Sequence, residues 1–167
     1  KGGIYLVMVP GHGYFEILVN DQKFSFTTDT TDLVENFKVE GSEDNEVFYE
    51  YLTYIMPRNR QISELNKQVQ QKQQAGQSSQ KLQKKISELS REVSEKRENL
   101  IENHPDLFAS KLLKAMKEPE VENMTEGGKQ LSRQEQFNLY RKNFFDNLDF
   151  SDPRMLRTPI LHNKVEK

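Results

Sequence analysis

The sequence contains no cysteine. A chain without thiols forms no disulfide and offers no thiolate ligand to a metal. Thiol-based nucleophilic or redox catalysis by these residues is therefore excluded. The absence does not choose between cytosol and periplasm, because many periplasmic domains also lack cysteine. The absence of cysteine limits the chemistry of this chain, but it says almost nothing about the chemistry of a neighbouring domain.

Apolar residues are also scarce. They make up 34% of the 167 residues, against 30% charged residues, whereas about half is usual for a globular domain. Long helices that each bury one narrow apolar stripe suit such a composition. Outright disorder fits less well, because ten Phe and six Tyr are more than a disordered chain carries. We therefore expect a folded but thin protein.

Neither an excess of positive charge nor a long hydrophobic run is present. The chain has 24 Lys and Arg against 26 Asp and Glu, a formal charge of −2. Without a basic excess to neutralise phosphates, a nucleic-acid partner has little electrostatic support. No run approaches the roughly 20 apolar residues that span a bilayer, so we expect no transmembrane segment.

The first forty residues predict a small antiparallel β-meander. Residues 4–9 and 14–19 are β-rich runs separated by the turn signal 10–13. In the third run, residues 23–28, the alternation of apolar and polar side chains is that of a half-buried strand. A weaker fourth run covers 37–39. Because so few strands are marginally stable alone, we expect a helix, or strands outside this chain, to cover the apolar face.

The remainder, residues 41–167, is predicted to be helical and to begin with a long antiparallel hairpin. Ser42 is the expected N-cap, followed by acidic residues in the first turn. The expected arms cover about 43–73 and 79–103, with Ala75-Gly76 in the turn between them. Pro57 should kink or break the first arm. The apolar stripe comprises Phe48, Leu52, Ile55, Ile62, Leu65 and Val69 in one arm and Leu82, Ile86, Leu89, Val93 and Leu100 in the other.

A cluster of shorter helices is expected after the hairpin. Pro105 is suited to the first turn of one helix, and residues 118–130 are expected to form a mobile loop. The capping box Ser132–Glu135 opens an aromatic-rich helix, and residues 151–153 suggest a further helix start. The aromatic group is interpreted as the main core of the protein, with a docking surface as the alternative; it comprises Phe137, Tyr140, Phe144, Phe145 and Phe150.

No catalytic, cofactor-binding or metal-ligating residue is predicted. His12, His104 and His162 have no second histidine at the spacing of a helical metal pair. The acidic cluster 43–46 follows an N-cap residue and lacks the spacing of a calcium loop, so it is interpreted as a helix first turn. We expect neither a cofactor nor enzymatic activity from this chain.

Several strings resemble the N-terminal region of multidomain TlpA-type thiol:disulfide interchange proteins from the envelope of Bacteroides-like bacteria. The similarity runs in order along most of the chain and consists of local strings rather than catalytic signatures. The strings are residues 3–6 (GIYL), 14–19 (YFEILV), 41–46 (GSEDNE), 48–51 (FYEY), 146–154 (DNLDFSDPR) and 156–159 (LRTP).

The resemblance implies a domain of unknown function that precedes a thioredoxin-like domain in a periplasmic or outer-membrane-anchored envelope protein. In such proteins the redox chemistry belongs to a Cys-x-x-Cys pair, and no position here matches it. The chain is then expected to position the redox domain, bind a client or dimerise, and to continue in both directions beyond residues 1–167. The alternative is a free-standing coiled-coil interaction module with no redox connection.

Overall fold

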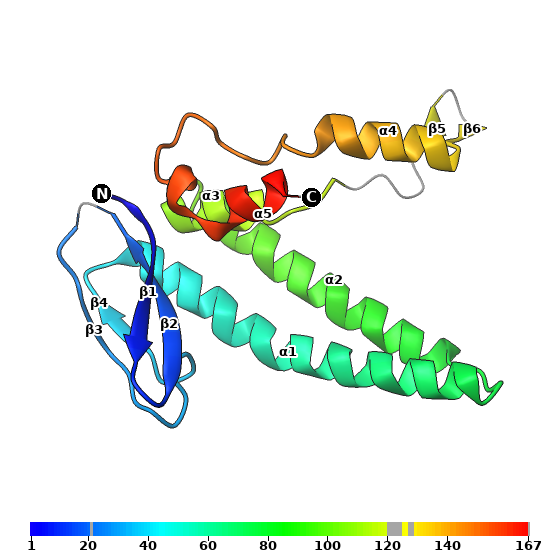
Figure 1. Ribbon diagram of the computed structural model, residues 1–167, viewed down its shortest axis with the longest axis horizontal. Coiled ribbons are helices and arrows are strands. Elements are labelled where there is room, and N and C mark those ends of the chain that lie inside the picture. Colours follow the sequence, from blue (N-terminus) through cyan, green and yellow to red (C-terminus); the bar gives the residue numbers. More distant parts are fainter. Residues whose placement is uncertain (21, 120–124, 127–128, 167) are drawn as a thin grey trace.

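The computed structural model describes residues 1–20, 22–119, 125–126 and 129–166. Figure 1 shows strands at the N-terminus, a long helical hairpin, and shorter helices, the last of which lies at the base of the hairpin. The predicted fold class, a mostly helical α+β arrangement, is confirmed. No helix in the described ranges is both long and apolar enough to cross a bilayer.

The four expected strands pair as two separate hairpins rather than as one continuous sheet. Strand β1 (Gly3–Val9) pairs antiparallel with β2 (Gly13–Val19), with Val9 opposite Gly13 at the turn. The shorter strands β3 (Ser25–Thr27) and β4 (Lys38–Glu40) pair with each other. Aromatic rings join the two hairpins instead of backbone hydrogen bonds: Phe15 of β2 lies 5.5 Å from Phe26 of β3, centroid to centroid.

Helix α1 (Glu43–Gln74) begins where the sequence predicts and passes through Pro57 without a break. Ser42 is its N-cap, and its hydroxyl accepts a hydrogen bond from the amide of Asn45 at 3.3 Å. Proline removes the bond to the carbonyl four residues earlier, here that of Thr53. Both Thr53 and Pro57 are exposed, so the lost hydrogen bond lies on the solvent side of the helix, where its cost is small. Of the predicted kink or break at Pro57, the break was therefore wrong, because α1 is continuous.

Helix α2 (Gln80–Asn103) runs antiparallel beside α1, as the heptad-like stripe predicts (Figure 1). Leu65 and Val69 of α1 and Leu89 and Val93 of α2 are all buried. Hydrogen-bonded ion pairs add specificity, including Arg58–Glu92 at 3.0 Å. Each such partly exposed pair is worth about 1 kcal/mol or less, so burial of the stripe supplies most of the stability of the hairpin.

Helix α3 (Phe108–Ala115) starts three residues later than Pro105 predicts. Residues 104–107 form a turn, in which the amide of Leu107 donates to the carbonyl of His104 at 3.2 Å. Leu107 is the N-cap residue, but its side chain makes no capping hydrogen bond to the first turn of the helix. The carboxylate of Asp44 replaces the missing cap, because its Oδ1 accepts the amide of Ala109 at 2.9 Å. The true start was therefore set by a tertiary contact.

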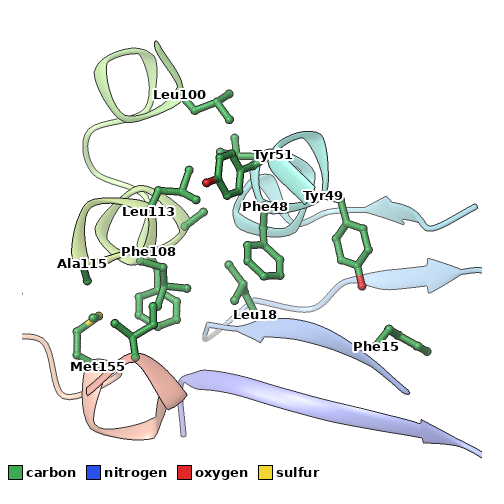
Figure 2. Close-up of a cluster of buried hydrophobic side chains, with 14 of the residues drawn as sticks. Phe15, Leu18, Phe48, Tyr49, Tyr51, Leu100, Phe108, Leu113, Ala115 and Met155 are labelled. Carbon is green, nitrogen blue, oxygen red and sulfur yellow. The ribbon is translucent and has the colours of Figure 1, made fainter. Parts of the chain in front are cut away.

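The main core lies where β2, the start of α1 and α3 meet (Figure 2). Apolar side chains from elements far apart in sequence are buried there at 3% exposure or less. They include Phe15, Leu18, Val47, Phe48, Tyr51, Leu100, Phe108, Leu112, Leu113 and Met155. Burying each large side chain contributes about 1.5–3 kcal/mol, so this junction holds the strands, the hairpin base and the C-terminal segment in one unit.

The C-terminal segment comprises helix α4 (Arg133–Asn143), a 3-10 turn η1 (Met155–Arg157) and helix α5 (Pro159–Val165). Most of the expected loop 118–130 lies outside the described residues. The part of it that is described includes two short paired strands, β5 (Thr125–Glu126) and β6 (Lys129–Gln130). Turn η1 lies beside the start of β1, where the Arg157 Nε donates to the carbonyl of Gly2 at 2.6 Å. Gly3 adopts a φ of +148° there, and an added Cβ would lie 2.8 Å from the Arg157 Cβ.

Candidate functional site

Helix α4 and the segment that follows it carry several exposed aromatic side chains. It begins at the predicted capping box, in which Ser132 and Glu135 satisfy each other's backbone amides. None of its residues is buried, and Figure 1 shows it at the periphery of the molecule. A three-turn helix with no buried face gains little from packing, so its stability comes from the capping box and from the segment that follows it.

The aromatic residues of this region form a connected surface rather than the main core. Rings follow one another from Tyr140 to Phe144 at 5.4 Å, to Phe145 at 5.1 Å and to Phe150 at 5.9 Å between centroids. Phe144 is buried, but Phe137, Phe145 and Phe150 are 55%, 38% and 66% exposed. The interpretation of this group as the main core was therefore wrong, because none of its five rings belongs to the buried core cluster and three of them are exposed.

We call these five residues, together with Val165, the aromatic surface. Around Phe137, Tyr140, Phe144, Phe145 and Val165 it forms an open hollow of about 530 Å³, also lined by Arg141 and Lys164. Because monomeric proteins rarely leave large aromatic side chains clustered in water, such a patch is typical of a contact site. Aromatic rings and arginine are also the side chains most enriched where proteins bind one another.

The base of the aromatic surface is anchored by Lys164 of α5. This lysine is only 8% exposed, and its Nζ donates to the carbonyls of Phe144 at 3.0 Å and Lys117 at 3.3 Å. The ammonium also lies 4.7 Å from the centroid of the Phe144 ring. Farther out, the hydroxyl of Tyr140 donates to the carboxylate of Glu118 at 2.9 Å. These contacts hold the rings in place without covering them.

A charged cluster connects the same segment to α3. The Nζ of Lys111 contacts Asp149 at 2.9 Å and Asp152 at 3.0 Å, and the guanidinium of Arg154 also binds Asp152. Hydrogen bonds from Ser151 and Lys111 lower the pKa of Asp149 to about 2. Hydrogen bonding to Arg154 holds the pKa of Asp152 well below its usual range, and the two carboxylates raise the pKa of Lys111. Such mutually neutralised charges position a backbone segment; no group is left poised to exchange protons near neutral pH.

The three histidines belong to three different elements. His12 is in the exposed β1–β2 turn, His104 ends α2 and contacts Glu43 at 3.1 Å, and His162 contacts Glu166 at 3.1 Å. Over the described ranges, no three His, Asp or Glu side chains are grouped so as to hold a metal ion. Within the described ranges, no histidine therefore lies in a group of side chains that could hold a metal ion.

A second exposed apolar area, on the β1–β2 hairpin, was not predicted. Tyr5, Leu6 and Met8 of β1 and Tyr14 of β2 are 41%, 57%, 69% and 59% exposed. The signal was present in the sequence, because residues 3–9 contain neither a charged residue nor a proline to protect an outer strand. The sequence instead predicts that a helix, or strands outside this chain, covers the apolar face of the strands.

Comparison with protein-family models, with curated proteins and with solved structures finds no match to this chain. The resemblance to thiol:disulfide interchange proteins therefore stays a prediction, and so does the envelope location that it implies. The functional argument depends on the surfaces themselves.

Proposed function

We propose that this chain is a non-catalytic accessory domain of a periplasmic thiol:disulfide interchange protein and acts through protein contacts. The chemistry would belong to a Cys-x-x-Cys pair in a thioredoxin-like domain of the same polypeptide. The role of the chain would be to position that domain, to bind clients or to dimerise, in a periplasmic or outer-membrane-anchored protein. The family-like strings carry the redox part of this proposal.

The observation that carries the contact role is the aromatic surface. Lys164 binds the carbonyl of Phe144, and Glu118 binds the hydroxyl of Tyr140. The rings of Phe137, Phe145 and Phe150 remain exposed. Clients of a disulfide-exchange protein present apolar segments before they are fully folded, and aromatic side chains bind such segments with large contact area and little loss of side-chain entropy. We therefore assign client binding to the aromatic surface.

A free-standing coiled-coil module draws less support from the structure. Such a module associates through an apolar helical stripe, and here Leu65, Val69, Leu89 and Val93 are already buried between α1 and α2. The outer faces of the hairpin carry mainly charged and amide side chains, as the sequence predicts. Association through the hairpin would have to use these solvated faces.

The redox part is tested on the natural polypeptide. An antibody against this chain isolates the protein from its own cells, and intact mass is measured before and after reduction and thiol alkylation. The proposal predicts a protein longer than 167 residues, found in the envelope fraction, that gains the mass of at least two thiol labels after reduction. A protein that takes up no thiol label would contradict the redox connection and favour the free-standing module.

A further inference from the structure

The outer edge of β1 is open and has the composition of a strand that pairs with another strand. Among the described residues β1 pairs with β2 alone, so alternate residues of β1 direct their amide and carbonyl groups away from the hairpin. Natural edge strands are kept from pairing by charges, proline, bulges or short length. β1 is seven residues long with the sequence GIYLVMV, and beyond its first residues, which η1 covers, it has no such protection.

From this edge we infer that β1 binds β1 of a second copy of the chain, antiparallel and about a two-fold axis at Val7. A two-fold axis in an antiparallel pair places the central residue opposite the same residue of the second copy. The residues before and after it then lie opposite each other. With Val7 at the centre, Leu6 lies opposite Met8 of the second copy, and Tyr5 lies opposite Val9. The most exposed side chains of β1 then cover one another.

The surroundings of β1 favour this register. The start of the strand is occupied, because Arg157 of η1 binds the carbonyl of Gly2 and its side chain crowds Gly3. A centre at Val7 uses residues 5–9 and leaves this end free of the second copy. The paired stretch contains no charge on either copy, so neither repulsion nor a buried unpaired charge opposes association.

The available area predicts a weak dimer. The four exposed side chains Tyr5, Leu6, Met8 and Tyr14 offer roughly 450 Å² per copy, taking about 200 Å² for a large side chain. Two copies would bury at most roughly 1,000 Å² with the backbone edge included, because part of each side chain stays exposed on the faces of the sheet; this is at the lower limit for specific interfaces. We therefore expect a concentration-dependent equilibrium of monomer and dimer, completed by backbone hydrogen bonds across a four-stranded sheet.

Sedimentation equilibrium of residues 1–167 with paired charge substitutions tests this inference. The variant Leu6→Lys/Met8→Lys places like charges opposite each other twice, and Leu6→Lys/Met8→Glu places opposite charges there. Both positions are exposed, so both variants should fold, which circular dichroism verifies. The matched control is Leu156→Lys, on an equally exposed leucine of η1.

The wild type and the Leu156→Lys control should dimerise alike. The dissociation constant should rise at least about tenfold in the Lys/Lys variant and stay within a few-fold of the wild type in the Lys/Glu variant. A monomeric wild type, an unaffected Lys/Lys variant, or equal weakening of both double variants would each overturn the inference.

This inference deepens the dimerisation part of the proposed function and rests on it. The β1 dimer and the proposed function can be disproved independently, because the sedimentation experiment uses no redox domain and no client. Loss of β1 pairing would leave the aromatic surface and its client role in place.

Discussion

The side chain of Asn45 takes the place of a neighbouring strand beside Leu18. The amide of Leu18 donates to the Oδ1 of Asn45 at 2.8 Å, and the Nδ2 of Asn45 donates to the carbonyl of Leu18 at 2.8 Å. Both residues have no exposed surface. The first turn of α1 is thus joined to β2 by two hydrogen bonds from which water is excluded.

Replacing Asn45 by alanine should destabilise the whole protein. It leaves the amide and the carbonyl of Leu18 buried without partners, which costs about 1–3 kcal/mol for each unsatisfied group. The free energy of unfolding in urea should therefore fall by about 2–6 kcal/mol. Asn163→Ala, at an exposed position of α5, should change it by less than about 0.5 kcal/mol. Equal effects of the two substitutions would show that the Asn45 pairing is not important.

Replacing Asp44 by asparagine should loosen α3 in particular. The carboxylate of Asp44 is 1% exposed and accepts from Ala109 at 2.9 Å and from Asn20 at 3.2 Å. An amide in its place supplies one acceptor instead of two, so we expect a loss of about 1–3 kcal/mol. Hydrogen exchange at the amide of Ala109 should accelerate. Glu46→Gln, in the same helical turn but exposed, is the control and should leave that exchange rate unchanged.

Truncating the aromatic surface should leave stability nearly intact. Phe137→Ala removes a ring that is 55% exposed, whereas Phe108→Ala removes one that is fully buried. The same chemical change should cost less than about 1 kcal/mol in the first case and about 3–5 kcal/mol in the second. Thermal and urea unfolding measure both. A large loss in Phe137→Ala would mean that this ring supports the fold instead of a contact.

The charged cluster predicts a loss of stability in acid. The pKa of Asp149 is lowered to about 2 and that of Asp152 is lowered as well. A carboxylate whose pKa is lower in the folded state stabilises that state above its unfolded pKa of about 3.9. This contribution is lost as the pH falls from about 4 through 2. Side-chain carbonyl NMR titration should place the midpoint of Asp149 near 2, and Asp152→Asn should show a smaller loss of stability over that interval. A midpoint of Asp149 near 3.9 would contradict the cluster.

Local signals predicted the regular elements well. Ser42, the Ser132–Glu135 box and Ala75-Gly76 fix helix ends through contacts within a few residues, and such contacts are visible in sequence. The α1–α2 hairpin follows from two matched apolar stripes. These predictions succeeded because each depends on spacing along one chain segment.

Tertiary contacts explain the failures. The start of α3 depends on Asp44, 65 residues away from Ala109, and no local pattern contains that information. The aromatic group of α4 has the composition of a core, but whether a helix face is covered depends on what lies against it. Asp44 and Asn45 read as ordinary first-turn residues, although their side chains join three elements. No sequence pattern distinguished a cap residue from a buried tertiary contact.

The central claim, that the aromatic surface serves client contact in a disulfide-exchange protein, is tested most directly by exchange kinetics of the natural full-length protein. The rate is measured with a disulfide-bonded, unfolded protein client and with a small-molecule disulfide, for the wild type, Phe137→Ser/Phe150→Ser and the control Leu156→Ser. We predict that the double variant reacts at least about tenfold more slowly with the protein client, as expected when contact residues are lost, and normally with the small disulfide. Equal rates of wild type and double variant with the protein client would contradict the claim.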